Sequence, residues 1–123
     1  MKNGNYNLKD RTKKFALRII KLAKALPRNT LGFVVSKQII RSGTSVASNY
    51  RAVCRSRSRA DFNSKVGIVI EEADETAFWL EIIIESDLLK SELVAELLGE
   101  ANEITAIMVT SRKTSISKLN NKN

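Results

Sequence analysis

The chain has 123 residues, 43% of them hydrophobic, so it is long enough to bury one core without disulfides or a structural metal. Five glycines and one proline are too few for the many turns of a β protein, and the composition favours helices. No histidine is present and Cys54 is the single cysteine, which excludes a Cys/His metal cluster and an intrachain disulfide; we expect neither metal nor cofactor.

The net charge of +8 is divided unevenly along the chain. Residues 1–65 hold 16 of the 21 Lys and Arg residues, whereas residues 66–110 hold 11 of the 13 Asp and Glu residues. This asymmetry indicates either an anionic partner or basic and acidic helices that pack side by side. No apolar run is long enough to span a bilayer and no apolar signal core is seen, so we expect a cytoplasmic protein without a membrane partner.

The first predicted element is a helix over about residues 8–26, which Pro27 ends. Spacings of four and three residues place its core side chains on one face. They are Leu8, Thr12, Phe15, Ile19, Leu22 and Leu26. A second row contains Ala16, Ile20 and Ala23.

The second predicted helix covers about residues 31–54, with Thr30 as its N-cap. Its stripe is partly polar. It contains Val35, Ile39, Ser42, Val46, Asn49 and Val53. A buried amide at Asn49 would need partners and would fix the register of the helix.

The third and fourth predicted helices cover about residues 59–86 and 91–115. Ser58 followed by Asp61 resembles a capping box at the start of the third helix. The third stripe is Phe62, Val66, Val69, Ala73, Thr76, Leu80 and Ile83, and the fourth is Val94, Leu97, Ala101, Ile104 and Met108. We expect the polar tail beyond them to be frayed.

Short connections between these helices predict an antiparallel up-down-up-down four-helix bundle, formed as a single domain by residues 1–123. The third helix carries more apolar residues than one stripe needs. The surplus is Ile68, Ile70, Ala77, Phe78, Trp79, Ile82 and Ile84. With the second row of the first helix, this surplus predicts a homo-oligomer; the alternative is thick packing within one bundle.

The small-residue run SGTSVAS, residues 42–48, predicts a close contact between helices. Gly43 inside a helix costs about 1 kcal/mol relative to alanine, so close packing must offset it. Catalysis by Ser45 or Asn49 is disfavoured because no histidine is available as a base, and Cys54 is expected to be a buried packing residue. We therefore expect no enzymatic activity.

A cluster of basic residues follows this run. It consists of Arg51, Arg55, Arg57 and Arg59, with Lys65 close by, and a further basic edge on the first helix contains Lys13, Lys14, Lys21 and Lys24. Guanidinium groups at such a corner suit phosphates. The alternative is a solvated face, or pairing with the acidic third helix. Because no aromatic ladder lies beside the arginines, we expect contacts to the nucleic-acid backbone rather than to bases.

Three blocks, RSGTSVASNYRA (41–52), RSRSRADF (55–62) and EADETAFWLE (72–81), together resemble a known bacterial family. It is the four-helix-bundle family found in intervening sequences of large-subunit ribosomal RNA genes, which includes the accessory variability protein of diversity-generating retroelements. The resemblance extends from FALRIIKLAKALP (15–27) to EANEITAIMVTSRKT (100–114). It implies a ring-like homopentamer with a basic surface and, in the retroelement branch, binding of nucleic acid and of a reverse transcriptase.

Matched residue by residue, the resemblance implies structural or oligomer-packing roles for Arg41, Ser42, Gly43, Ser45, Asn49, Glu72 and Trp79. We expect Arg41 to reach Glu72 or Glu75 on a neighbouring helix. The leading functional hypothesis is a non-enzymatic, homo-oligomeric protein that binds RNA or DNA through phosphates. The alternative is an interaction scaffold or accessory subunit that docks an acidic protein, for example a reverse transcriptase.

Overall fold

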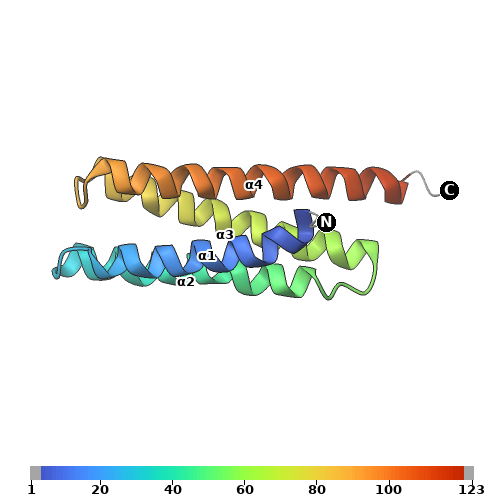
Figure 1. Ribbon diagram of the computed structural model, residues 1–123, viewed down its shortest axis with the longest axis horizontal. Helices are drawn as coiled ribbons and strands as arrows, with labels where there is room; N and C mark the ends of the chain where they lie inside the picture. Colours follow the sequence, from blue (N-terminus) through green and yellow to red (C-terminus); the bar gives the residue numbers. More distant parts are fainter. Residues whose placement is uncertain (1–3, 121–123) are drawn as a thin grey trace.

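The structure, a computed structural model, describes residues 4–120 and the side chains of residues 8–120. It consists of α1 (Gly4–Lys24), α2 (Thr30–Val53), α3 (Arg59–Glu85) and α4 (Ser91–Asn120), and the described residues form no strand. Successive helices run in opposite directions (Figure 1). The start of α1, the end of α2, the start of α3 and the end of α4 therefore lie at one end of the bundle. The predicted all-helical four-helix fold is confirmed.

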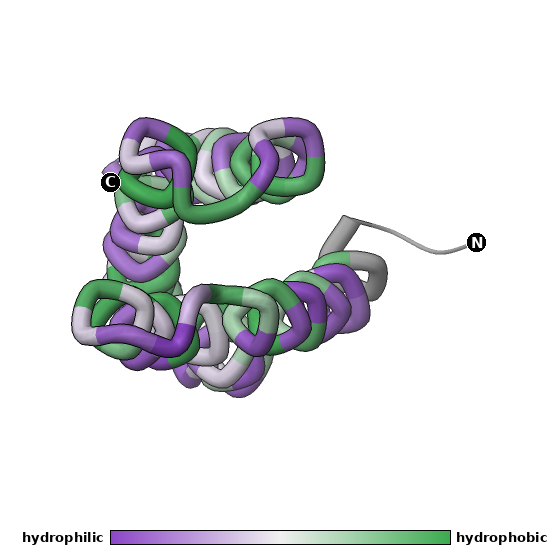
Figure 2. Tube along the Cα trace, turned by 90° about the vertical axis from the view of Figure 1, so that its left-hand side faces the viewer, coloured by the Kyte–Doolittle hydropathy of each residue, from purple (hydrophilic) through white to green (hydrophobic). Residues whose placement is uncertain are grey.

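The core lies along the predicted stripes. Every stripe residue of α1 and α4 is buried, and so is every stripe residue of α3 except the half-buried Phe62. Polar and apolar segments alternate along each helix (Figure 2), as expected for amphipathic helices that each bury one face. No helix within residues 4–120 combines the length and the apolar character needed to cross a membrane.

Two details of α2 differ from the prediction. Asn29, not Thr30, is the N-cap, because its side chain accepts a hydrogen bond from the Gly32 N–H at 2.9 Å. At the other end Tyr50 is buried, whereas Asn49 is half-buried and donates to the carbonyl of Ser45 in its own helix at 2.8 Å. The expectation that Asn49 is a buried amide is therefore wrong, and its role in fixing helix register stays a prediction.

The ends of α1 and α4 also differ from the expected bounds. The backbone N–H groups of Ala25 and Leu26 donate to carbonyls three residues back, so the last turn before Pro27 is tighter than an α-helix. The helix α4 continues to Asn120 instead of ending at residue 115, since no Gly or Pro interrupts residues 116–120. The end of the tail, where we expected fraying, lies outside the described residues.

Close helix contact at the small-residue run is confirmed at Gly43. A Cβ added at Gly43 would lie 2.8 Å from Cγ2 of Ile19, so α1 and α2 approach closely at this point. The buried hydroxyls of Ser42 and Thr76 form a hydrogen bond of 2.9 Å that joins α2 to α3. Ser45 is half-buried, and its backbone carbonyl accepts a hydrogen bond from the side chain of Asn49.

Three arginines join basic to acidic helices. Arg11 binds Glu100 through Nε–Oε2 (2.7 Å) and Nη2–Oε1 (2.8 Å) and also pairs with Glu103. Arg18 pairs with Glu96. Both connect α1 to α4, the two neighbouring helices that contact each other least. The predicted pairing of basic and acidic helices therefore applies to these residues.

Arg41 pairs with Glu75 and lies 3.3 Å from Glu72, as expected. The hydrogen bond to Glu75 raises the pKa of Arg41, and the same bond lowers the pKa of Glu75. Trp79 is half-buried and donates its Nε1–H to Glu75 at 3.3 Å, while its ring meets Phe78 edge to face. Arg41, Glu75 and Trp79 thus form one polar network on the outside of the α2–α3 seam.

Part of the predicted apolar surplus is absorbed within the single chain. Ala16, Ala23 and Ala77 are buried, so they provide no evidence for a second chain. Other apolar side chains are exposed. They are Leu17, Leu31, Phe33, Val34, Ile68, Phe78, Leu93 and Leu119. Phe33 is 58% exposed and Leu93 is 73% exposed, and neither belongs to the apolar surplus predicted from the sequence.

Candidate nucleic-acid interface

The residues Arg51, Arg55, Arg57 and Arg59, which we call the basic corner, lie at one end of the bundle. After Val53 the backbone N–H groups of Arg55 and Ser56 donate to carbonyls three residues back, which turns the chain sharply out of α2. Ser58 then caps α3, and its hydroxyl accepts from the Asp61 N–H at 3.0 Å. One short turn therefore brings these four positions to the same end of the bundle.

All four arginines are exposed, and none forms an ion pair with a carboxylate among the described side chains 8–120. The glutamates of α3 and α4 that do pair use Arg11, Arg18 and Arg41 instead. The positive charge of the basic corner thus faces solvent.

Lys65 is not part of this free charge. Its Nζ lies 2.9 Å from Oδ2 of Asp61, which also accepts from the Arg57 N–H at 3.1 Å. The Lys65 hydrogen bond and the Arg57 N–H hold the pKa of Asp61 below its usual value. Lys65 therefore fixes the first turn of α3.

The lysines of α1 form a separate group. Lys13, Lys14 and Lys21 are all exposed, and Lys14 pairs with Asp10 at 3.0 Å. At 1.5 Å per residue, Lys21 lies about 25 Å along α1 from Gly4, at the end away from the basic corner. The structure does not bring Lys21 together with the arginines.

The end of α4 supplies basic groups that the site prediction lacked. Arg112, Lys113 and Lys118 are exposed and lie at the same end as the basic corner. Arg112 also donates its Nε–H to the carbonyl of Asn63 at 3.0 Å, which ties α4 to the start of α3. The sequence contained the information to predict this, because the basic C-terminal end of an antiparallel fourth helix lies at the same end of the bundle as the basic corner.

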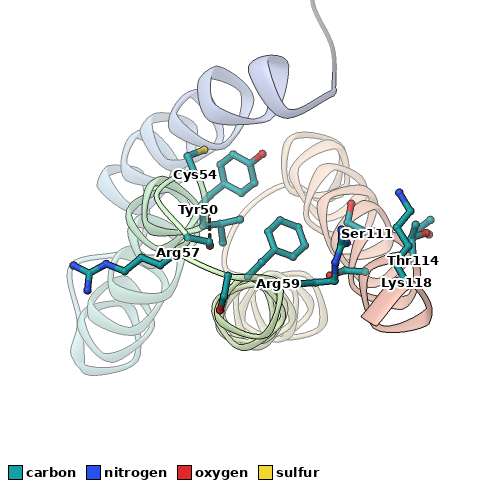
Figure 3. A pocket seen from close by; sticks show the side chains of 13 residues that line it. Tyr50, Cys54, Arg57, Arg59, Ser111, Thr114 and Lys118 are labelled. Carbon is teal, nitrogen blue, oxygen red and sulfur yellow. Dashed lines mark hydrogen bonds between the residues drawn. The ribbon is translucent and has the colours of Figure 1, made fainter. Parts of the chain in front are cut away.

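A cavity of about 800 Å³, the corner cavity, lies between the ends of α2 and α4 and the start of α3. Its lining residues are Tyr50, Val53, Cys54, Ser56, Arg57, Ser58, Arg59, Phe62, Thr110, Ser111, Thr114, Ser115 and Lys118. Figure 3 shows Arg59 extending toward α4, where Ser111 lies, whereas Arg57 points away from the cavity.

Two aromatic side chains therefore lie beside the basic corner, although they do not form a ladder. Tyr50 and Phe62 both line the cavity, although one belongs to α2 and the other to α3. Burial, with a smaller effect of the neighbouring Cys54 thiol, raises the pKa of Tyr50. Cys54 itself is exposed and not the buried packing residue that was expected.

Comparisons with known proteins identify the family of this chain. A search of curated proteins finds no match. A solved structure from Bacteroides thetaiotaomicron, a protein of unknown function from the S23 ribosomal protein family, is 39% identical with a TM-score of 0.80 and covers 86% of this chain and 98% of its own. The profile of the 23S rRNA-intervening sequence proteins matches residues 5–110, and the chain belongs to that family.

Proposed function

We propose that this protein is a non-enzymatic nucleic-acid-binding protein that holds the phosphate backbone of RNA or DNA at its basic corner. The observation that supports the proposal best is the unpaired state of Arg51, Arg55, Arg57 and Arg59 among the described side chains. A guanidinium group without a carboxylate partner can bind two phosphate oxygens at once. Arg112, Lys113 and Lys118 extend the positive surface across the end of α4.

The family name connects these proteins with 23S rRNA genes, which makes RNA the first ligand to test. Binding through the backbone neutralises phosphates and releases counterions, so affinity falls as salt rises. A basic corner that reads no bases should bind structured RNA and duplex DNA in a similar way.

The test is a titration of labelled RNA hairpin and duplex DNA at two salt concentrations. The variant Arg51/Arg55/Arg57/Arg59→Ala should weaken binding and reduce the magnitude of the salt slope by about 3–4, at about 0.9 per phosphate on a duplex. A matched control, Lys24/Arg28/Lys37/Lys90→Ala, removes the same charge from exposed positions at the opposite end. The control should keep most of the salt slope.

Equal losses in both variants would show that only net charge matters and that the basic corner is not the site. Absent or salt-independent binding by the parent protein would refute the proposed function. Far-UV circular dichroism of each variant checks that the helices are retained.

Self-association is the second part of the proposal. The protein forms a homo-oligomer in this proposal, and the family resemblance favours a ring-like pentamer. The exposed apolar side chains form the contacts between its subunits. Leu31, Phe33, Val34 and Leu93 lie at the end of the bundle opposite the basic corner. Exposed apolar side chains that gather into one large patch commonly mark an interaction surface. Light scattering at several concentrations tests this part, and a strict monomer would refute it.

The alternative is an interaction scaffold or accessory subunit, for example for a reverse transcriptase. The basic corner suits an acidic protein as well as a polyanion. Binding of an acidic partner by the parent protein, with no binding of either nucleic acid at low salt, would favour this alternative. The single, unpaired cysteine is consistent with a cytoplasmic location for either function.

A further inference from the structure

The corner cavity has the size and the chemistry of a small-ligand site. Its volume of about 800 Å³ falls within the range of roughly 300–1,000 Å³ that is typical of such sites. Its lining includes three cationic residues and no carboxylate. The cavity therefore suits an anionic ligand.

The hydroxyl of Ser115 provides an independent indication of a ligand. Ser115 is only 4% exposed and lines the cavity, yet its Oγ has no hydrogen-bond partner among residues 8–120. Other buried hydroxyls of the bundle have partners: Thr12 bonds to the carbonyl of Leu8, and Thr76 bonds to the carbonyl of Glu72. An unpaired buried hydroxyl is unfavourable, and a ligand oxygen in the cavity would satisfy it.

The two sides of the cavity differ in character. Tyr50, Val53 and Phe62 give an apolar and aromatic side from α2 and α3. Arg59 reaches across from α3, and the side formed by α4 carries hydroxyl groups and Lys118. A matching ligand has a flat apolar part and an anionic part, as a nucleotide does.

The cavity is also continuous with the basic corner. Arg57 lines it but points away from it, and Arg51 and Arg55, which precede Arg57 in the chain, are exposed. A strand whose phosphates contact these arginines would bring the next nucleotide to the cavity mouth. A base paired in a duplex is not available to enter, whereas an unpaired base can stack on an aromatic ring.

We propose that the corner cavity takes one unpaired nucleotide of the bound nucleic acid, with its base against Phe62 and its phosphate near Arg59, Ser115 and Lys118. This inference rests on the proposed function, because the basic corner must first hold the flanking backbone. It adds recognition of an unpaired position to binding that is otherwise blind to sequence.

The test compares a blunt RNA duplex with the same duplex carrying one unpaired 5′-phosphorylated nucleotide, and uses free adenosine monophosphate as a third probe. The parent protein should prefer the overhang about tenfold, the gain that one stacked base typically gives. Arg59→Gln should reduce this preference, whereas Arg55→Gln, at an arginine outside the cavity lining, should weaken both duplexes equally.

Ser115→Ala separates a ligand-binding role from a structural one. It should lower affinity for the overhang about fivefold, the effect of one hydrogen bond, without lowering the unfolding midpoint, because the hydroxyl has no partner in the part of the chain that the structure describes. Ser117→Ala, at an exposed position on the same helix, should change neither quantity. A lower unfolding midpoint with unchanged affinity would make Ser115 a structural group and refute this assignment.

Failure of the two proposals is distinguishable. If blunt and overhang duplexes bind the parent protein equally and with a salt slope that needs the basic corner, the cavity proposal is wrong and the proposed function stands. If adenosine monophosphate binds and neither duplex does, both proposals are wrong and the cavity is a site for a free nucleotide.

Discussion

Replacement of Gly43 by alanine tests the packing of α1 on α2 most directly. The new Cβ would lie 2.8 Å from Cγ2 of Ile19 and 3.1 Å from its Cβ. Rotation of the Ile19 side chain cannot move its own Cβ, and Ile19 is fully buried. The two helices must therefore separate by a few tenths of an ångström, against a core that is close-packed.

Two opposing effects set the magnitude. Overpacking of a core typically costs about 1–3 kcal/mol, while alanine gains about 1 kcal/mol over glycine inside a helix. We expect Gly43→Ala to lower the free energy of unfolding by about 1 kcal/mol. Gly99→Ala is the matched control, because a Cβ at Gly99 meets nothing within 4 Å; it should raise the same quantity by about 1 kcal/mol.

The assay is urea unfolding followed by far-UV circular dichroism, with all variants at one protein concentration. The double variant Ile19→Ala/Gly43→Ala should be more stable than the sum of the single changes by about 1 kcal/mol, since the closest atom, Cγ2 of Ile19, and its Cγ1 are gone and only the Cβ at 3.1 Å remains. If Gly43→Ala stabilises the protein as much as Gly99→Ala does, the close contact does not restrict this position and the reasoning is wrong.

Two further predictions concern the α2–α3 seam. Ser42→Ala removes the buried hydroxyl that is hydrogen-bonded to Thr76 and should lower the free energy of unfolding by about 1 kcal/mol, whereas the exposed control Ser48→Ala should change it by less than about 0.5 kcal/mol in the same assay. Arg41→Ala should destabilise the protein at neutral pH but not in acid. Arg41 holds the pKa of Glu75 below its ordinary 4.5, so the stabilisation is present above that pH and is lost as pH falls through the lower, folded value. Unfolding midpoints measured from neutral pH into acid check this, and a destabilisation that persists in acid would contradict it.

The helices were predictable because apolar spacing follows the helical period. The stripe of α1, from Leu8 to Leu26, is buried throughout, and Ser58 caps α3 as expected. Caps with similar chemistry are harder to distinguish: Asn29 and Thr30 are adjacent, and only the direction of the Asn29 side chain decides. The burial of Tyr50 in place of Asn49 has a similar cause. The two residues are adjacent in α2, and the apolar spacing does not decide which of them faces the core.

The candidate site was only partly predictable. The basic corner is local in sequence, and one turn after Val53 brings its arginines together. The corner cavity needs residues more than fifty positions apart, such as Tyr50 and Ser115, so spacing within one segment cannot reveal it. Lys118 lies beyond residue 115, where α4 was expected to end, so it was not predicted as part of this helix.

The weak contact between α1 and α4 has a consequence for how the chain folds. Three of the four helix seams join elements that are consecutive in sequence, and such local contacts close short loops and form quickly. The α1–α4 seam instead joins Arg11 to Glu100, 89 positions away, through a guanidinium–carboxylate pair. The chain can therefore pack as a row of consecutive hairpins first, and the bundle closes last, along a seam that is held partly by charge.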